Sequence, residues 1–189
     1  RPAATPVQQE LANLLETAAT ALEQGYHDTA LDTYQKGLSI ARTTKDRVNE
    51  ERFLNGIGAA YVAQERFDEA RPIFDQALEL ARSLGDPRAL ARSLNNLGSL
   101  FAQKGEWSAA QMYHQQALDA ARETGSADVI ALMLENLAHD YLSQDNPSYA
   151  QHLLKEAVVL SQAGQQPALA ARMVGKLAEA TLVGGDRAS

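Results

Sequence analysis

Arginine and asparagine side chains recur at one register along the chain, and these residue types are suited to binding another polypeptide. Arg52, Arg92 and Arg172 are separated by multiples of forty residues, and Asn55 and Asn95 each follow an arginine by three positions. A guanidinium group can bind a carboxylate through two parallel hydrogen bonds, and a carboxamide offers a donor and an acceptor to an extended backbone. The pattern therefore indicates polar recognition of a peptide.

The sequence lacks the motifs that usually mark catalysis, metal binding or phosphate binding. It has four histidines and no cysteine, and none of the histidines lies in an HExxH arrangement. Gly184-Gly185 does not open a phosphate-binding loop of the GxxxxGK type. We therefore expect no enzyme activity, no cofactor and no metal site.

The composition excludes several classes of partner. Apolar residues make up 45% of the 189 residues and are mainly Ala and Leu, which favours helices with a substantial core. The formal net charge of −7 argues against a nucleic-acid partner, and no apolar run is long enough for membrane insertion. The absence of cysteine fits reducing and oxidising compartments alike. A cytoplasmic location is favoured, and a processed exported chain is the alternative.

A repeat of forty residues positions the arginine and asparagine side chains. Three segments that begin at Arg52, Arg92 and Leu132 align without a gap. Small, aromatic and alanine residues occupy matching positions in the three segments: Gly58, Gly98 and Ala138; Tyr61, Phe101 and Tyr141; Ala70, Ala110 and Ala150. Because several independent positions share one period, the chain is predicted to be an array of similar structural units.

Each unit is predicted to be a pair of helices. Leu97 and Phe101 fall on one face of a first helix, and alanines at helical spacing mark one face of a second. Glycines follow the second helices as left-handed caps would; these are Gly85, Gly125 and Gly164. A single helix pair buries only one face, so successive units must stack on one another.

The repeat resembles the tetratricopeptide repeat, and the resemblance covers nearly the whole chain. The residues that match the signature of that family are Leu97-Gly98, Phe101, Gly105, Trp107, Ala110 and Ala117. The period of forty, in place of the usual period of about thirty-four, resembles a subclass with extended helices. That subclass includes GoLoco-binding polarity adaptors, kinesin light chain and Rap-like peptide receptors. The resemblance implies a concave groove lined by the first helix of each unit.

We predict an all-α fold, a right-handed superhelical solenoid of stacked helix hairpins with about four and a half repeats. A disordered lead-in is predicted at residues 1–7, followed by a single domain over residues 8–189. The repeats are expected at residues 8–46, 47–86, 87–126 and 127–166, with a final helix at residues 167–183.

The candidate binding residues lie opposite the core stripe of the first helices. They are Arg52, Asn55, Arg92, Asn95, Asn96, Ser99, Glu135, Asn136, His139, Arg172 and Lys176. This set contains four cations, whereas the same faces of the first helices carry only two carboxylates, Glu135 and Glu179. We therefore expect the partner segment to carry acidic residues. Arg92 and Asn96 are expected to be replaceable without loss of the fold. The alternative is that these side chains are the ordinary solvated face of an amphipathic helix.

We predict that the chain is a protein–protein interaction module, a scaffold or adaptor whose groove binds a peptide or a protein segment. Two alternatives have a different basis. The chain could be a peptide-sensing regulatory domain of a larger regulator, or a structural element that self-associates through the ends of the solenoid. None of these functions requires nucleic acid or insertion into a membrane.

Overall fold

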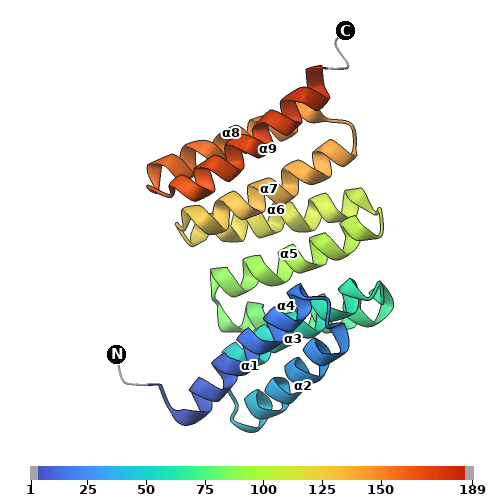
Figure 1. The fold of residues 1–189 in the computed structure, drawn as a ribbon, viewed down its shortest axis with the longest axis vertical. Coiled ribbons are helices and arrows are strands. Elements are labelled where there is room, and N and C mark those ends of the chain that lie inside the picture. The colour runs from blue at the N-terminus through green and yellow to red at the C-terminus, as the bar shows by residue number, and fades with distance from the viewer. Residues whose placement is uncertain (1–3, 186–189) are drawn as a thin grey trace. The chain divides into compact units, whose positions relative to one another are not determined.

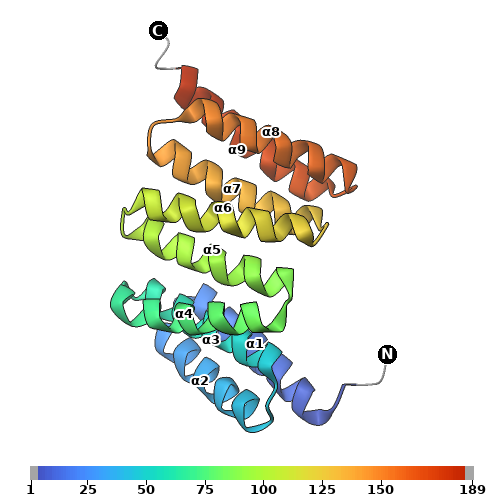
Figure 2. The same ribbon diagram turned by 180° about the vertical axis from the view of Figure 1, so that it is seen from behind.

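The computed structural model describes residues 4–185, and this part of the chain forms nine α-helices and no strand (Figures 1 and 2). The helices are α1 (Pro6–Glu23), α2 (His27–Thr43), α3 (Arg47–Ala63), α4 (Phe67–Leu84), α5 (Pro87–Gln103), α6 (Trp107–Glu123), α7 (Ala127–Ser143), α8 (Pro147–Ala163) and α9 (Pro167–Gly185). The predicted all-α class of tetratricopeptide-like helix hairpins is confirmed. Within the described residues, no helix is long and apolar enough to cross a membrane.

The chain divides into two compact units, Arg1–Leu100 and Phe101–Ser189. In the first unit α2 packs on α1 and α3, α4 packs on α3, and α1 also contacts α3. In the second unit α8 packs on α7 and α9, and α7 also contacts α9. First helices of neighbouring repeats are therefore in contact within each unit. The single domain and the repeat boundaries given above remain predictions.

Small residues let the helices approach each other closely. The alanines that recur in the second helices, Ala30, Ala70, Ala110 and Ala150, are all completely buried. Gly58 in α3 lies against the ring of Phe74 in α4, where an added Cβ would be 2.6 Å from Cδ1 of the ring. A glycine inside a helix is otherwise unfavourable. Close packing of α3 on α4 therefore accounts for Gly58.

The first helix begins at Pro6, two residues before the predicted start of the first repeat. The N–H of Gln8 donates to Oγ1 of Thr5 at 3.2 Å, and the N–H of Thr5 donates to Oε1 of Gln8 at 2.9 Å. This reciprocal cap favours a helix start, as does a proline at the first helical position. The predicted lead-in therefore overlaps α1 at residues 6 and 7, and its residues 1–3 lie outside the described residues.

The glycines predicted to end the second helices do not all have the same conformation. Gly85 and Gly125 are left-handed, with φ of 63° at each. Gly164 has φ of −76°, and the left-handed residue is instead Gln165, with φ of 54°. Lys45 has the same role after α2. The prediction of a left-handed cap at Gly164 is therefore wrong by one residue. The left-handed residues repeat every forty positions, at Lys45, Gly85, Gly125 and Gln165, and Gly164 lies one position before that register.

Candidate peptide-binding surface

The first unit carries an open hollow of about 500 Å³ formed by α1, α2, α3 and α5. Its lining residues are Ala12, Leu15, Glu16, Ala19, Tyr34, Arg52, Asn55, Gly56, Arg92 and Asn96. We call it the α1–α3–α5 hollow after the three first helices. Four of the predicted binding residues lie in it, so the sequence register does bring them together.

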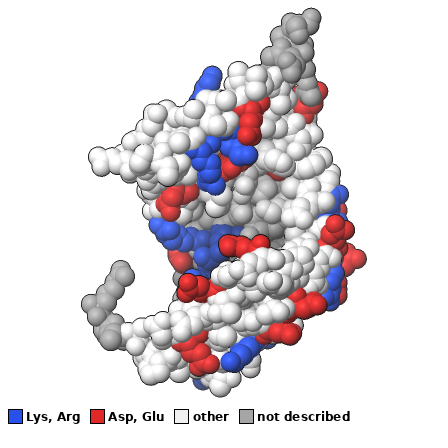
Figure 3. All heavy atoms as spheres, viewed as in Figure 1, with Lys and Arg blue, Asp and Glu red and all other residues white. Residues whose placement is uncertain are grey.

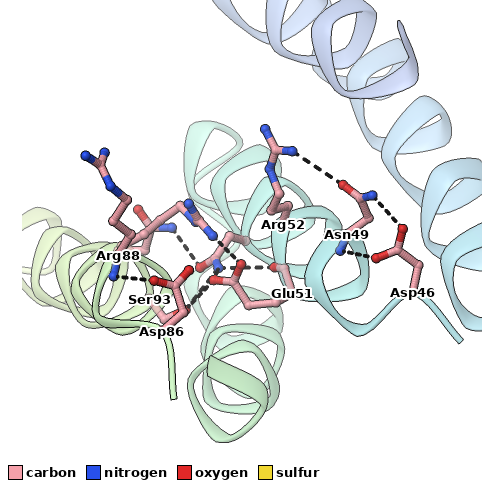
Figure 4. Close-up of polar contacts among 10 residues, drawn as sticks. Asp46, Asn49, Glu51, Arg52, Asp86, Arg88 and Ser93 are labelled. Carbon is pink, nitrogen blue, oxygen red and sulfur yellow. Dashed lines mark hydrogen bonds and ion pairs between the residues drawn. The ribbon is translucent and has the colours of Figure 1, made fainter. Parts of the chain in front are cut away.

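A buried carboxylate, Glu51, organises the polar side of this hollow (Figure 4). Arg92 donates to Oε2 of Glu51, and the hydroxyl of Ser93 donates to Oε1 at 2.9 Å. Nδ2 of Asn55 also donates to Oε1 of Glu51, at 2.6 Å. Nδ2 of Asn96 then donates to Oδ1 of Asn55 at 2.8 Å. These five residues form what we call the Glu51 network, and they join α3 to α5.

The Glu51 network makes two of the predicted binding residues structural. Asn55 is only 4% exposed, and its amide is already bonded to Glu51. Arg92 is the ion-pair partner of a carboxylate that has no solvent exposure. A buried charge is tolerated only when it is paired, and removing one partner is strongly destabilising. Contrary to the expectation from the sequence, we therefore predict that replacing Arg92 destabilises the fold.

Arg52 is the cation of the hollow that remains available to a ligand. It is exposed, and Figure 4 shows its side chain directed away from Glu51. Nη1 of Arg52 donates to Oδ1 of Asn49 at 3.4 Å, and Asn49 is held in turn by Asp46. Within residues 4–185, no ion pair joins Arg52 to a carboxylate. Its guanidinium can therefore accept a carboxylate of a ligand.

The opposite wall of the hollow is mainly apolar. It consists of α1 side chains and the ring of Tyr34, which is 5% exposed. Burial, and to a smaller extent the charge of Glu23, raises the pKa of the Tyr34 phenol above its ordinary value. The phenol therefore stays protonated at neutral pH. The hollow combines a wall that is apolar except for the exposed carboxylate of Glu16 with a polar floor and one available guanidinium.

The second unit has a smaller hollow of about 160 Å³ formed by α7, α8 and α9. Its lining residues are Glu135, Asn136, Ala138, His139, Leu142, Leu154, Lys176 and Glu179. His139 is exposed, and its ring centroid lies 6.3 Å from that of Trp107. Nη2 of Arg172 lies 3.1 Å from Oε2 of Glu135, although Arg172 itself does not line the hollow.

The local excess of positive charge expected from the sequence is largely neutralised. Arg92 pairs with Glu51 and Arg172 with Glu135, while Nζ of Lys176 lies 3.3 Å from Oε2 of Glu179. In Figure 3, basic side chains gather over α5 and over α9, and acidic side chains lie beside them in both places. Any preference for an acidic ligand therefore depends on Arg52. The remaining candidates, Asn95 and Ser99, are half-buried and line neither hollow.

A third hollow, of about 540 Å³, lies among α2, α3 and α4. It is lined by Arg42, Arg47, Glu50, Leu54, Pro72, Asp75, Gln76, Glu79 and Leu80. Its acidic groups are already paired: Glu50 with Arg42 at 3.0 Å, Asp75 with Arg71 at 3.0 Å and Glu79 with Arg82 at 2.8 Å. The carboxylates of this hollow are therefore not available to a ligand, and its remaining cation, Arg47, donates to Oγ of Ser83 at 3.4 Å.

Glu51 and Ser93 were not among the residues expected from the sequence, although Glu51 left a visible signal. The repeat places it at the register of Leu11, Ala91 and Ala131, where a core residue is expected. Those three residues are completely buried, as is Glu51. A charged residue at a core register is the signal that could have found it.

A second buried polar pair, in the second unit, was missed in the same way. Nδ1 of His114 in α6 lies 2.5 Å from Oδ2 of Asp140 in α7, and both side chains are buried. The residues forty positions earlier are Phe74 and Leu100, and those forty positions later are Leu154 and Ala180. Nε2 of His114 and Oδ1 of Asp140 make no hydrogen bond within the described residues. This pair belongs to the core and faces neither hollow.

Comparisons with known proteins support the repeat architecture. No curated protein matches the sequence. Among solved structures, the apo form of RapI superposes with a TM-score of 0.72 at 13% identity, covering 90% of this chain and 62% of RapI. BtubC from P. vanneervenii gives a TM-score of 0.73 at 20% identity, covering 97% of this chain and 86% of BtubC. A kinesin light chain of Podosopora anserina with nearly identical repeats gives 0.74 at 17% identity, covering 94% of this chain and 87% of the other.

These identities establish the likeness of the fold alone. The sequence profile that describes the tetratricopeptide repeat matches residues 49–123 and 90–163, which together make up more than half of the chain. The fold of this family is generally a non-catalytic scaffold for protein–protein interaction. From the forty-residue period, the helix hairpins and this match, the chain belongs to the tetratricopeptide repeat family.

Proposed function

We propose that the α1–α3–α5 hollow binds a segment of another protein, and that this binding is the function of the chain. The observation that carries the proposal is the position of Arg52, an exposed guanidinium beside an apolar wall and above a fixed polar floor. Binding sites for peptides commonly combine apolar contact area with a few placed polar groups.

The ligand side chains follow from the two walls of the hollow. An apolar side chain of the ligand would pack against Leu15 and Tyr34, while a carboxylate would form two hydrogen bonds with Arg52. Asn96 lies on the same side as Arg92, at the edge of the Glu51 network, and its amide can meet the ligand backbone. The Glu51 network fixes the position of the Asn96 amide, which lowers the entropic cost of its contact with the ligand.

The first experiment selects ligands from a random peptide library on the wild-type chain and measures their affinities for two arginine variants. Arg52→Ala should weaken selected acidic peptides by about tenfold or more, since a charge-assisted hydrogen bond is worth roughly 1.5–3 kcal/mol. Arg82→Ala is the matched control, because Arg82 is an exposed arginine on α4 outside this hollow. Higher salt should weaken binding to the wild type more than binding to Arg52→Ala.

A second variant tests the hollow independently of charge. Ala12 is exposed and lines the hollow, so Ala12→Trp should fill the space without entering the core. The variant should keep its melting temperature and lose the selected peptides. Selected peptides that bind Arg52→Ala and Ala12→Trp as well as they bind the wild type would show that the ligand occupies another surface.

A further inference from the structure

The α1–α3–α5 hollow contains two opposite charges that have no ion-pair partner. Arg52 of α3 is exposed and donates to the side chain of Asn49. Glu16 of α1 is also exposed and lines the same hollow. Within residues 4–185 neither side chain forms an ion pair, and the two do not pair with each other. The hollow therefore offers both a cation and an anion to a ligand.

The packing of the first helices sets the positions of these two charges. The hydrogen bonds between α3 and α5 join residues that are 38 to 42 positions apart in the sequence. Because α1 contacts α3 in the same unit, the repeat places Glu16 beside Gly56 and Ala12 beside Arg52. Gly56 follows Arg52 by one helical turn, and the axes of packed helices lie about 8–10 Å apart, so the Cα atoms of Glu16 and Arg52 are about 10 Å apart.

A third polar group of the hollow is the hydroxyl of Tyr34, which reaches the hollow from α2. The ring of Tyr34 lies against Gly56, where an added Cβ would be 2.7 Å from Cζ, the atom that carries the hydroxyl. The ring also meets that of Phe53 edge-on, with 6.5 Å between the centroids. Tyr34 is only 5% exposed, and within the described residues its hydroxyl makes no hydrogen bond. Gly56 therefore lets a phenol of a second helix reach the level of Glu16.

Packing alone does not account for this hydroxyl. The residues at the same register of the later repeats are Phe74, His114 and Leu154, so an apolar side chain can fill this position. Taking a hydroxyl out of water without giving it a partner is unfavourable. A nearly buried hydroxyl that lines a hollow and lacks a partner is suited to donate a hydrogen bond to a ligand.

We infer that the segment bound in the α1–α3–α5 hollow carries a basic residue as well as an acidic one, with a backbone carbonyl between them. This inference rests on the function proposed above. The acidic residue pairs with Arg52, the basic residue pairs with Glu16, and the carbonyl accepts a hydrogen bond from Tyr34. An extended chain advances about 3.3 Å per residue, so charges about 10 Å apart match residues about two to four positions apart. Glu16 repels a segment that carries acidic residues alone.

The first experiment selects binders of the wild-type chain from three random peptide libraries. The libraries differ only in their charged residues, which are aspartate with lysine, aspartate alone or lysine alone. The tightest binders should come from the library with both, and should carry the two charges about two to four positions apart. Binders from aspartate alone that are equally tight would overturn the inference.

The second experiment uses the sign of one effect. Fluorescence anisotropy of the tightest peptide should show that Glu16→Gln weakens binding by about two- to fivefold, the range of a partly exposed ion pair. If the hollow accepts an acidic segment alone, the same change removes a repulsion and strengthens binding. Glu10→Gln is the matched control, because Glu10 is exposed on α1 and does not line the hollow. Replacing the lysine of the peptide by glutamine should abolish the effect of Glu16→Gln.

The third experiment tests the phenol. Tyr34→Phe should weaken the same peptide by about two- to tenfold, the range of a single neutral hydrogen bond. It should not lower the melting temperature of the free chain, because no hydrogen bond within the described residues is lost. A lower melting temperature with unchanged affinity would show that the hydroxyl serves the fold, and would overturn its assignment to the ligand.

The outcomes separate this inference from the proposed function. If Glu16→Gln and Tyr34→Phe leave the affinity unchanged while Arg52→Ala and Ala12→Trp lower it, the hollow binds a segment but the inferred pattern of charges is wrong. If none of the four variants affects the selected peptides, or if no library yields a binder, both the inference and the proposed function are overturned.

Discussion

Replacing His114 and Asp140 together, by Leu and Ala, should leave the second unit as stable as the wild type or more stable. The two side chains are 3% and 0% exposed, and each has one polar atom without a hydrogen bond among the described residues. Leu and Ala are the residues that the chain itself uses at this register, at Leu154 and Ala180. Their total volume is close to that of His and Asp, so the change need not open a cavity.

The single variants should behave differently from the double variant. Removing one partner of a buried hydrogen-bonded pair costs about 1–3 kcal/mol, and more where the remaining group is charged, because that group stays buried without its partner. Replacing the whole pair by apolar residues is often neutral or stabilising by about 1–4 kcal/mol. We therefore expect His114→Leu and Asp140→Ala each to lower the unfolding free energy by about 3 kcal/mol. The double variant should recover all of that loss.

The assay is urea unfolding of the four proteins, followed by tryptophan fluorescence. Trp107 is the only tryptophan of the chain and begins α6, so its signal reports on the second unit. Circular dichroism of the same samples gives the unfolding of the whole chain. If the double variant loses the sum of the two single losses, the residues are not energetically coupled, and the reasoning from the buried pair fails.

Three other predictions concern stability and are read from thermal unfolding. Gly58→Ala should destabilise by about 1–3 kcal/mol because its Cβ would meet an aromatic ring, whereas Gly175→Ala, with open space around it, should stabilise by about 0.5–1 kcal/mol. Arg92→Ala should cost about 3 kcal/mol because the buried carboxylate of Glu51 loses its counter-ion and keeps only the donors Asn55 and Ser93, whereas Arg52→Ala should stay within about 0.5 kcal/mol of the wild type. Thr5→Ala should cost about 0.5–2 kcal/mol through loss of the cap of α1. Equal melting temperatures for Gly58→Ala and Gly175→Ala, or for Arg92→Ala and Arg52→Ala, would contradict the contacts assigned to Gly58 and Arg92. An unchanged melting temperature for Thr5→Ala would contradict the cap assigned to α1.

The fold could be predicted because helix contacts leave a periodic record in the sequence. Gly58 and Ala138 are small where helices touch, and that requirement returns every forty residues. Helix ends leave a weaker record. The cap formed by Thr5 depends on two local hydrogen bonds, which the apolar period does not reveal. The left-handed residue after α8, in contrast, could have been located by the period, because Gln165 lies forty residues after Gly125; the glycine at position 164 pointed to the wrong residue.

The candidate site was only partly predictable from the sequence. The register of a helix separates its core face from the opposite face, but it does not reveal contacts with the first helices of neighbouring repeats. Asn55 and Arg92 lie opposite the hairpin core, yet contact between α3 and α5 buries the first and pairs the second. Arg52 has the same register as Arg92 and stays exposed. The difference comes from Glu51, which lies forty-one residues before Arg92, whereas the residue forty-one positions before Arg52 is Leu11, which carries no charge.

The two buried polar clusters also bear on how a repetitive chain selects its correct neighbours. The alanine faces of the second helices are nearly identical, so they favour several stacking registers about equally. The Glu51 network favours a single stacking register, because a shift by one repeat would bring Met133 or Phe53 to the place of Ser93. Glu51 would then lose a hydrogen bond in a buried site, at a cost of about 1–3 kcal/mol.

His114 and Asp140 discriminate in the same way in the second unit, because the equivalent positions elsewhere hold apolar residues. The double variant His114→Leu/Asp140→Ala should therefore gain stability and lose specificity. Refolded from urea at high protein concentration, it should form more domain-swapped oligomer than the wild type, since misassembly is the characteristic failure of repeat chains. Size-exclusion chromatography of the refolded proteins measures that fraction. Equal fractions would show that packing alone selects the neighbours, and the buried pair would then have no part in specifying the register.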